Sequence, residues 1–518
     1  MKRAALVFLI TLATYGLTAA GHLFSPDEEV LFRTTRSLAS GEGFAIVPIL
    51  QGDRSFASRP ANPPRPDGRE FGQYGIGQPI LAVPLVWIGN ALARIGSDAT
   101  WAALYGDEPF GPRDLGIPQT AAELAPRWAC SWFNVLLGAA MAALVYLLCL
   151  EAVCDARAAM WAALLYALGS MAWPHSRPFF TEPLAAFFLM LAFYGLLRAM
   201  RCGHLRWCLV AGCAAGWAFL VRNDSVLAYP GLAVMMLLPI VSVARRRGGS
   251  FLAAWIAFAI PVILAGALQL FLNRLHFGNA LATGYSDQQE GVKFSTPIIA
   301  GLYGYLFSAG KGLFFFSPAL ILSFFGWKAL ARRWAGLSRA LVWALALMIL
   351  CPLAIQSTWQ NWAGGWCWGP RHVFQIHCFF AVPIAAYLAA NWTRNARMAI
   401  MLMLAVGAAV QLLGASVNFN RFYQQFFRSP GDPNAYFIMY DGFDQAYWGQ
   451  YYQLLWRTTP ADPLNPIALY PPAPIQQSLY IPYQTMWAGY PVLIRQGQID
   501  NFWLRAATGQ TPAGVSAP

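Results

Sequence analysis

Residues 4–29 read AALVFLITLATYGLTAAGHLFSPDEE, an apolar run followed within a few residues by three consecutive carboxylates, Asp27, Glu28 and Glu29. The run is long enough to cross the hydrocarbon core of a bilayer as a helix. Ionised groups are costly at the edge of a membrane because they lose hydration there. The sequence therefore predicts a membrane anchor that carries a candidate functional site directly outside the bilayer.

The composition extends this reading to most of the chain. Of its 518 residues, 58% are hydrophobic and 11% are charged, and the mean hydropathy is +0.45, whereas a soluble domain carries about 25% charged residues. The apolar stretches are continuous and do not alternate, which favours helices over a closed β-barrel. We expect an all-α polytopic membrane protein with about eleven crossings, at residues 4–21, 128–150, 157–172, 182–200, 207–221, 225–244, 251–272, 312–330, 339–357, 372–390 and 397–416.

The basic residues predict the orientation. With the N-terminus in the cytoplasm, the connections from Arg198 to Arg206, Arg245 to Arg247, Lys328 to Arg339 and Arg394 to Arg397 lie inside the cell, and all are basic, as the positive-inside rule requires. Residues 22–127 and 417–518 then lie outside as a large first loop and a small C-terminal cap. We expect residues 79–95 to lie along the membrane interface, because a crossing there would turn the basic connections outward.

Other classes fit the chain less well. The net charge of +12 comes from short basic clusters between apolar spans, so it indicates orientation signals and not nucleic-acid binding. The nine cysteines form no CxxC pair, which indicates neither a disulfide framework nor a zinc site. The N-terminal run could be a cleaved signal peptide ending near Ala20, but cleavage would detach the acidic cluster from its anchor, so we expect an uncleaved first helix.

The outer connections carry a mixture of carboxylates, cations, glycines and aromatic residues. Each residue has an ordinary alternative: Asp27 fits a helix cap, Glu182 fits the first turn of a helix, and the cations fit headgroup anchors. Their occurrence on one predicted side of the membrane favours a shared site. The candidates are Asp27, Glu28, Glu29, His175, Arg177, Glu182, Arg222, Asp224, Tyr285, Lys311, Trp366, Arg371 and His372.

This mixture suits glycosyl transfer from a phosphate-linked lipid. A carboxylate near the acceptor hydroxyl can act as a general base, and fixed positive charge stabilises the phosphate that leaves. Arginine and lysine supply that charge with no metal strictly required. A lipid-linked donor has to be met at a membrane interface, which explains why such a site would be carried on membrane helices.

The same residues resemble the C-type membrane glycosyltransferases, a superfamily that includes protein O-mannosyltransferases and lipid A aminoarabinose transferases. The resemblance covers residues 1–416 and rests on an ordered series of motifs. These are Asp27-Glu28, Thr181-Glu182-Pro183, Arg222-Asn223-Asp224, Phe277-Gly278-Asn279 with Gly284-Tyr285, Lys311, and Trp366-Cys367-Trp368-Gly369-Pro370-Arg371.

The resemblance implies roles for these residues. Asp27 would be the general base, with Glu28 and Glu182 in the same catalytic site, and Arg222, Lys311 and Arg371 would hold the lipid phosphate. The remaining candidates, namely His175, Arg177, Asp224, Tyr285, Trp366 and His372, are predicted to contact substrate, as is Glu29, which is not part of the acidic pair that carries the resemblance. It further implies a polyprenyl-phosphate monosaccharide donor, a lipid, glycan or protein acceptor, inversion at the anomeric carbon, and the outer face of a bacterial inner membrane.

Some points stay open at this stage. No metal is assigned, because His22, His175, His276 and His372 show no zinc-ligand spacing, although a divalent metal is left open. A sugar or lipid transporter is the main rival, but transporters carry ionisable residues near the midplane and inverted repeats, which this chain does not display. A ligase or polymerase of lipid-linked glycans is a further alternative. The sequence names neither the sugar nor the acceptor, and residues 417–518 match no known recognition domain.

Overall fold

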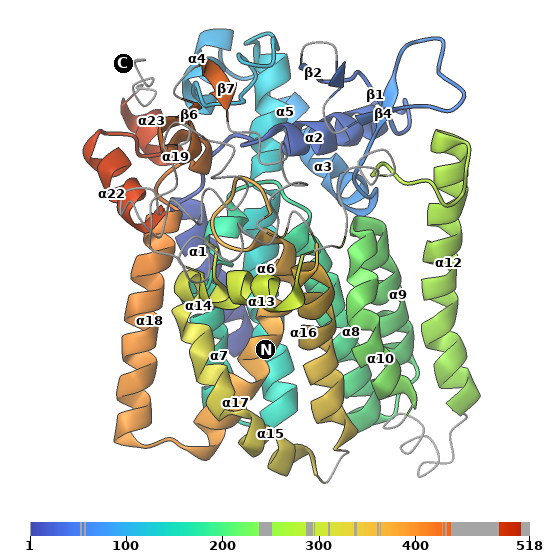
Figure 1. Cartoon of the computed structure of the whole chain (residues 1–518), viewed down its shortest axis with the longest axis vertical. Coiled ribbons are helices and arrows are strands. Elements are labelled where there is room, and N and C mark those ends of the chain that lie inside the picture. The colour runs from blue at the N-terminus through green and yellow to red at the C-terminus, as the bar shows by residue number, and fades with distance from the viewer. Residues whose placement is uncertain are drawn as a thin grey trace.

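The computed structural model describes residues 2–51, 54–55, 58–237, 251–285, 294, 296–308, 311–335, 339–359, 362, 364–426, 428–429, 432–436 and 486–508. Long helices stand side by side, and shorter helices and strands cover one end of them (Figure 1). The expectation of a mostly helical membrane protein is confirmed. Within the described residues, six helices are long and apolar enough to cross a membrane.

The helix bundle uses most of the predicted apolar spans. It comprises α1 (Lys2–Leu17), α5 (Ala121–Ser131) with α6 (Phe133–Val153), α7 (Ala156–Gly169), α8 (Glu182–Cys202), α9 (Arg206–Val221), α10 (Tyr229–Met235), α12 (Phe251–Phe277), α16 (Ala340–Ser357), α17 (Ala381–Ala390) and α18 (Arg394–Gly414). Shorter pieces are α13 (Ile298–Phe307), α14 (Leu313–Phe316) and α15 (Trp327–Trp334), and the 3₁₀ helices are η1 (Pro174–Ser176), η2 (Asn223–Ala228), η4 (Pro318–Phe325) and η5 (Arg371–Phe380).

Small residues let the bundle helices approach closely. A Cβ added to Gly212 of α9 would lie 2.2 Å from the Phe258 carbonyl oxygen of α12, and one added to Gly195 of α8 would lie 3.0 Å from the Trp207 carbonyl oxygen. Such contacts supply the van der Waals packing that holds helices together in lipid, where the hydrophobic effect between them is absent. Because α12 packs on α9 but is otherwise largely uncovered, it forms the edge of the bundle (Figure 1).

The predicted span over residues 312–330 is broken. It forms α14, η4 and α15 in succession, and the breaks fall at Ser317, which precedes a proline, and at Gly326. The residue before a proline is disfavoured in helical conformation. A Cβ at Gly326 would lie 1.8 Å from the Pro383 carbonyl oxygen, so only glycine permits this approach to α17. The eleven crossings therefore stay a prediction, and Arg245 to Arg247 lie outside the described residues.

The segment predicted as the first outer loop forms a cap of helices and short strands. Its elements are α2 (Pro26–Ala39), β1 (Ala45–Ile46), β2 (Leu50–Gln51), β3 (Arg54–Ser55), β4 (Ser58–Pro60), β5 (Glu70–Gly72), α3 (Gly77–Leu92) and α4 (Asp98–Tyr105). The sheet order is β1-β5-β4, antiparallel, with Phe71 opposite both Ala45 and Arg59. Helix α3 contains most of residues 79–95, the segment predicted to lie along the membrane interface, and it packs on α2 and α5.

The described tail residues join this cap. They form α19 (Phe419–Phe426), β6 (Arg428–Ser429), β7 (Asp432–Tyr436), α22 (Met486–Arg495) and α23 (Phe502–Thr508). These elements lie at the same end of the molecule as α2 and α4, whereas α15 lies at the opposite end (Figure 1). Asp500 of the tail connects the two segments, since its carboxylate accepts from His22 at 2.9 Å. Residues 437–485 of the predicted cap lie outside the described residues.

Candidate functional site

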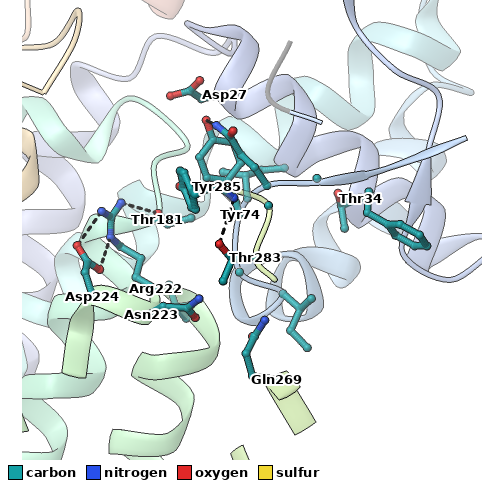
Figure 2. Close-up of a pocket in the computed structure, with 18 of the residues that line it drawn as sticks. Asp27, Thr34, Tyr74, Thr181, Arg222, Asn223, Asp224, Gln269, Thr283 and Tyr285 are labelled. Carbon is teal, nitrogen blue, oxygen red and sulfur yellow. Dashed lines mark hydrogen bonds and ion pairs between the residues drawn. The ribbon is translucent and has the colours of Figure 1, made fainter. Parts of the chain in front are cut away.

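A cavity of about 650 Å³ lies between the cap and the ends of the bundle helices that face it. Its wall includes residues from α2, from the segment after β5, from the ends of α8, α9 and α12, and from the start of η5. Figure 2 shows Asp27 on one side of this space, Arg222 and Asp224 together on another, and Tyr74 and Tyr285 between Asp27 and Gln269. Seven of the predicted site residues line it, namely Asp27, Glu182, Arg222, Asp224, Tyr285, Arg371 and His372.

Helix ends explain why these charges meet. Asp27 follows Pro26 in the first turn of α2, and Glu182 precedes Pro183 in the first turn of α8. The positive end of the helix dipole stabilises a carboxylate there, and proline is well accommodated at the first helical positions. Arg222 directly follows the last residue of α9, and Arg371 begins η5. The four residues are therefore presented at the same end of the bundle.

Arg371 connects the two carboxylates that are distant in sequence. Its Nη1 lies 3.3 Å from Asp27 Oδ2, and its Nε lies 3.4 Å from Glu182 Oε1. The guanidinium also stacks over the Phe180 ring, with 4.6 Å between Cζ and the ring centroid. The side chains of Arg371 and Asp27 retain 16% and 21% of their exposure, so the pair is reachable from the cavity while remaining mostly shielded from water.

Arg222 continues the chain of charges. Its Nη1 donates to Glu182 Oε1 at 2.7 Å, and its Nε and Nη2 donate to the two oxygens of Asp224 at 3.0 and 2.9 Å. Burial alone would lower the pKa of Arg222, but the carboxylates of Asp224 and Glu182 raise it well above its usual value. Gln356 Nε2 donates to Asp224 Oδ2 at 2.9 Å and completes the array.

Two tyrosines that the sequence analysis did not treat together border the Asp27 side of the cavity. Tyr74 and Tyr285 are in edge-to-face contact, with centroids 6.1 Å apart. Burial raises the pKa of Tyr74 well above its usual value, and the Asp27 carboxylate raises it further. Gln73 Nε2 donates to the Tyr74 hydroxyl at 2.8 Å. Gln73, Tyr74 and Gln356 were not among the residues predicted from the sequence. For the first two, the available signal was a pair of polar and aromatic residues shortly before an apolar helix.

Two predicted residues, Glu28 and Glu29, have buried structural partners and do not line the cavity. Glu28 accepts from the backbone N–H groups of Phe24 and Phe179, at 3.2 and 2.7 Å. Glu29 accepts from Arg127 at 2.6 Å and from Arg33 at 2.9 Å. Both carboxylates belong to α2, but they point to faces of the helix other than that of Asp27.

The other four lie in the surrounding loops. His175 Nε2 donates to the Trp368 carbonyl at 2.8 Å, and burial lowers the pKa of His175 to about 3. Arg177 Nη2 donates to Asp500 Oδ2 at 2.6 Å. Lys311 Nζ donates to loop carbonyls near residue 367, and Trp366 contacts Phe110 edge to face. None of the six lines the described cavity, and their predicted substrate roles stay predictions.

One group of residues has metal-ligand types. Within the described part of the chain, His22, Glu108 and Asp500 bring one ligand atom each to within 4.8 Å of one another, and all are buried. The carboxylates, however, already bind guanidinium groups: Asp500 binds Arg177 and Arg505, and Glu108 binds Arg421. Three cations beside two carboxylates disfavour a divalent metal at this position, so the group fits a buried ion-pair network.

The comparisons with known proteins agree with the resemblance inferred from the motifs. Residues 104–279, about a third of the chain, match the family model of dolichyl-phosphate-mannose-protein mannosyltransferases. The match includes Glu182 and Arg222. The resemblance is thereby confirmed over that part of the chain. No curated protein sequence matches the chain.

The chain is also similar to solved structures, each of low sequence identity. The ArnT structure from Cupriavidus metallidurans bound to undecaprenyl phosphate is 12% identical, with a TM-score of 0.47, over 95% of this chain and 78% of that one. The AglB oligosaccharyltransferase from Archaeoglobus fulgidus, in complex with an inhibitory peptide and a dolichol-phosphate, is 14% identical, with a TM-score of 0.45, over 80% of this chain. The match spans about half, 55%, of the AglB chain.

Proposed function

We propose that this chain is a membrane glycosyltransferase that moves a monosaccharide from a polyprenyl-phosphate donor to an acceptor hydroxyl or amine at the outer face of a bacterial inner membrane. The observation that carries the proposal is the contact between Asp27 and Arg371 on the wall of one cavity, although 344 positions separate them in sequence. The family match over residues 104–279 supports the same class of reaction.

The proposed reaction is a single displacement. Asp27 takes the proton from the acceptor as the acceptor atom bonds to the anomeric carbon, and the bond from that carbon to the phosphate oxygen breaks. The configuration inverts, and the polyprenyl phosphate leaves with an additional negative charge. Arg371, and Arg222 behind it, would stabilise that charge, because a fixed guanidinium in a partly dry site needs no reorganisation as the charge develops.

The neighbouring side chains would position Asp27 and the two guanidinium groups. Glu182 accepts from Arg222 and lies beside Arg371, so it would fix the distance between the two guanidinium groups. Tyr74 and Tyr285 present aromatic rings and hydroxyl groups on the Asp27 side (Figure 2), which suits contact with a sugar.

The test uses purified full-length protein in vesicles with a labelled polyprenyl-phosphate monosaccharide and lipid extracts as acceptors. We expect release of polyprenyl phosphate together with a product of inverted anomeric configuration. Movement of the intact donor across the membrane without cleavage of the sugar–phosphate bond would identify a transporter and overturn the proposal. A product of retained configuration would overturn the single displacement.

A further inference from the structure

Lys311 has an unusual environment next to the cavity. Its side chain is 1% exposed, and its Nζ donates to the carbonyl oxygens of Gly365 and Cys367, both at 2.9 Å. The Gly369 carbonyl oxygen and the Cys367 sulfur each lie 3.4 Å from the same nitrogen. An ammonium has three hydrogens, and here three carbonyl groups of one loop converge on it.

The backbone of this loop explains the convergence. Gly364, Gly365 and Gly369 have φ angles of +75°, +72° and +70°, a conformation that favours glycine because a Cβ is disfavoured there. The carbonyl oxygens of Gly365, Cys367 and Gly369, which alternate along this loop, point to one interior position. Buried carbonyl groups that lack a donor are costly, and oxygens that face one another also repel. The ammonium of Lys311 satisfies them, as a bound monovalent cation would.

The loop leads directly to the cavity. Arg371 follows Gly369 by two residues, and both Arg371 and His372 line the cavity wall. A second buried side chain supports the loop from another direction, because His175 Nε2 donates to the Trp368 carbonyl. Any displacement of residues 364–370 would therefore move the Arg371 guanidinium away from Asp27.

We propose that Lys311 is a positioning residue: its ammonium organises the carbonyls of residues 364–370 and thereby holds Arg371 against Asp27 and Glu182. The effect of this positioning role on activity rests on the proposed function. The role differs from direct binding of the donor phosphate by Lys311. The geometry favours the positioning role because the side chain ends among loop carbonyls and is not among the residues that line the described cavity.

A double-variant cycle separates the two roles. Lys311→Met should lower transfer by about a hundredfold, the scale expected when a catalytic group is misplaced by about 1 Å, whereas Lys328→Met in α15 removes the same charge far from the site and should leave transfer unchanged. If Lys311 acts through Arg371, Lys311→Met combined with Arg371→Gln should lose no more than Arg371→Gln alone. Multiplicative losses would indicate independent phosphate binding and overturn the proposal.

A second readout needs no transfer activity. Cys367 is 1% exposed beside Lys311 Nζ, so a maleimide should modify it slowly in the full-length protein, as measured by mass spectrometry of its peptide. In Lys311→Ala we expect modification at least about tenfold faster, since the carbonyls lose their donor. Added n-propylammonium should restore protection, whereas tetramethylammonium, which has no N–H, should not.

The outcomes of this labelling are distinct from those of the transfer assay. Equal protection of Cys367 in the wild type and in Lys311→Ala would overturn the positioning role even if transfer falls. Uniform reactivity of all nine cysteines in both Lys311 variants would also overturn it, because the lysine would then be required for the whole fold. If the wild type transfers no sugar, the proposed function fails while the labelling result still decides the role of Lys311.

Discussion

Replacing Glu28 by glutamine should remove a pH dependence of stability that the wild-type protein carries. Glu28 Oε2 accepts from the N–H groups of Phe24 and Phe179, and Oε1 accepts from Ser25 Oγ. Glutamine can keep this arrangement: its Oε1 accepts from the two backbone groups, and its Nε2 donates to the serine hydroxyl. The substitution thus removes the charge and keeps the junction between α2 and the loop at residues 171–181.

The magnitude follows from the titration of the group. Burial raises the pKa of Glu28 from 4.5 to about 8, although hydrogen bonds from Phe179 and Phe24 oppose the shift. The folded state therefore binds a proton more tightly than the unfolded state, and stability falls as the pH rises from about 4.5 to about 8. The whole interval corresponds to up to about 5 kcal/mol, a large fraction of the stability of a typical domain.

Thermal unfolding of the purified protein in detergent, followed by tryptophan fluorescence, measures this effect at about pH 5 and about pH 8.5. The difference in stability between Glu28→Gln and the wild type should grow in favour of the variant as the pH rises. Glu29→Gln is the matched control. Burial would raise the pKa of Glu29, but Arg127 and Arg33 lower it overall, so its contribution is complete above about pH 4.5.

Glu29→Gln should therefore destabilise the protein by a similar amount at both pH values, because it breaks a buried ion pair. A Glu28→Gln difference that stays constant between the two pH values would refute the reasoning. A stability advantage of Glu28→Gln over the wild type that shrinks as the pH rises would refute the predicted direction of the effect.

Three further substitutions test other contacts. Arg222→Lys cannot keep both hydrogen bonds to Asp224, so transfer should fall by about tenfold to a hundredfold, as loss of a charged hydrogen bond worth about 1.5–3 kcal/mol predicts; an unchanged rate in the vesicle assay would contradict this. Gly75→Ala would place a Cβ 2.3 Å from the Leu220 carbonyl oxygen and should lower the stability by about 1–3 kcal/mol, and an unaltered thermal unfolding curve would show that the loop yields freely. Asp500→Asn should cost about 3–5 kcal/mol because it leaves buried guanidinium groups without their carboxylate; full retention of the unfolding temperature would argue against the tail as an anchor of the cap.

The helices were largely predictable from the sequence because the signal is local. Continuous apolar stretches produced the spans at residues 182–200 and 251–272, and the structure has α8 and α12 there. The break within residues 312–330 was not predictable from hydropathy, since it depends on the contact of Gly326 with Pro383 of another helix. Tertiary contacts, and not local apolarity, decide where such a stretch stops being a helix.

The candidate site was predictable in part. The charges at helix ends identified Asp27, Glu182, Arg222 and Arg371, which the structure brings to one cavity. The sequence could not tell which of three adjacent carboxylates enters it. Each residue of a helix is rotated by about 100° from the last, so Asp27 reaches the cavity while Glu28 and Glu29 point to other partners.

The contacts of Lys311 were also not predictable from the sequence. From the sequence, a lysine among glycines and aromatic residues is typical of a phosphate contact. The structure instead directs its ammonium to the carbonyls of residues 364–370. That contact depends on the positive φ angles of Gly364, Gly365 and Gly369, which no pattern in the region of residue 311 reveals.

The measurement that tests the central claim most directly is sugar transfer by Asp27→Asn, compared with Asp67→Asn. Asp67 lies in the same outer segment, pairs with Arg65 and has a side chain 42% exposed, so its substitution makes the same chemical change outside the described cavity. We expect Asp27→Asn to lower the transfer rate by about 10²–10⁴-fold, the usual cost of losing a general base, and Asp67→Asn to leave it unchanged. Transfer by Asp27→Asn within about threefold of the wild-type rate would contradict the account.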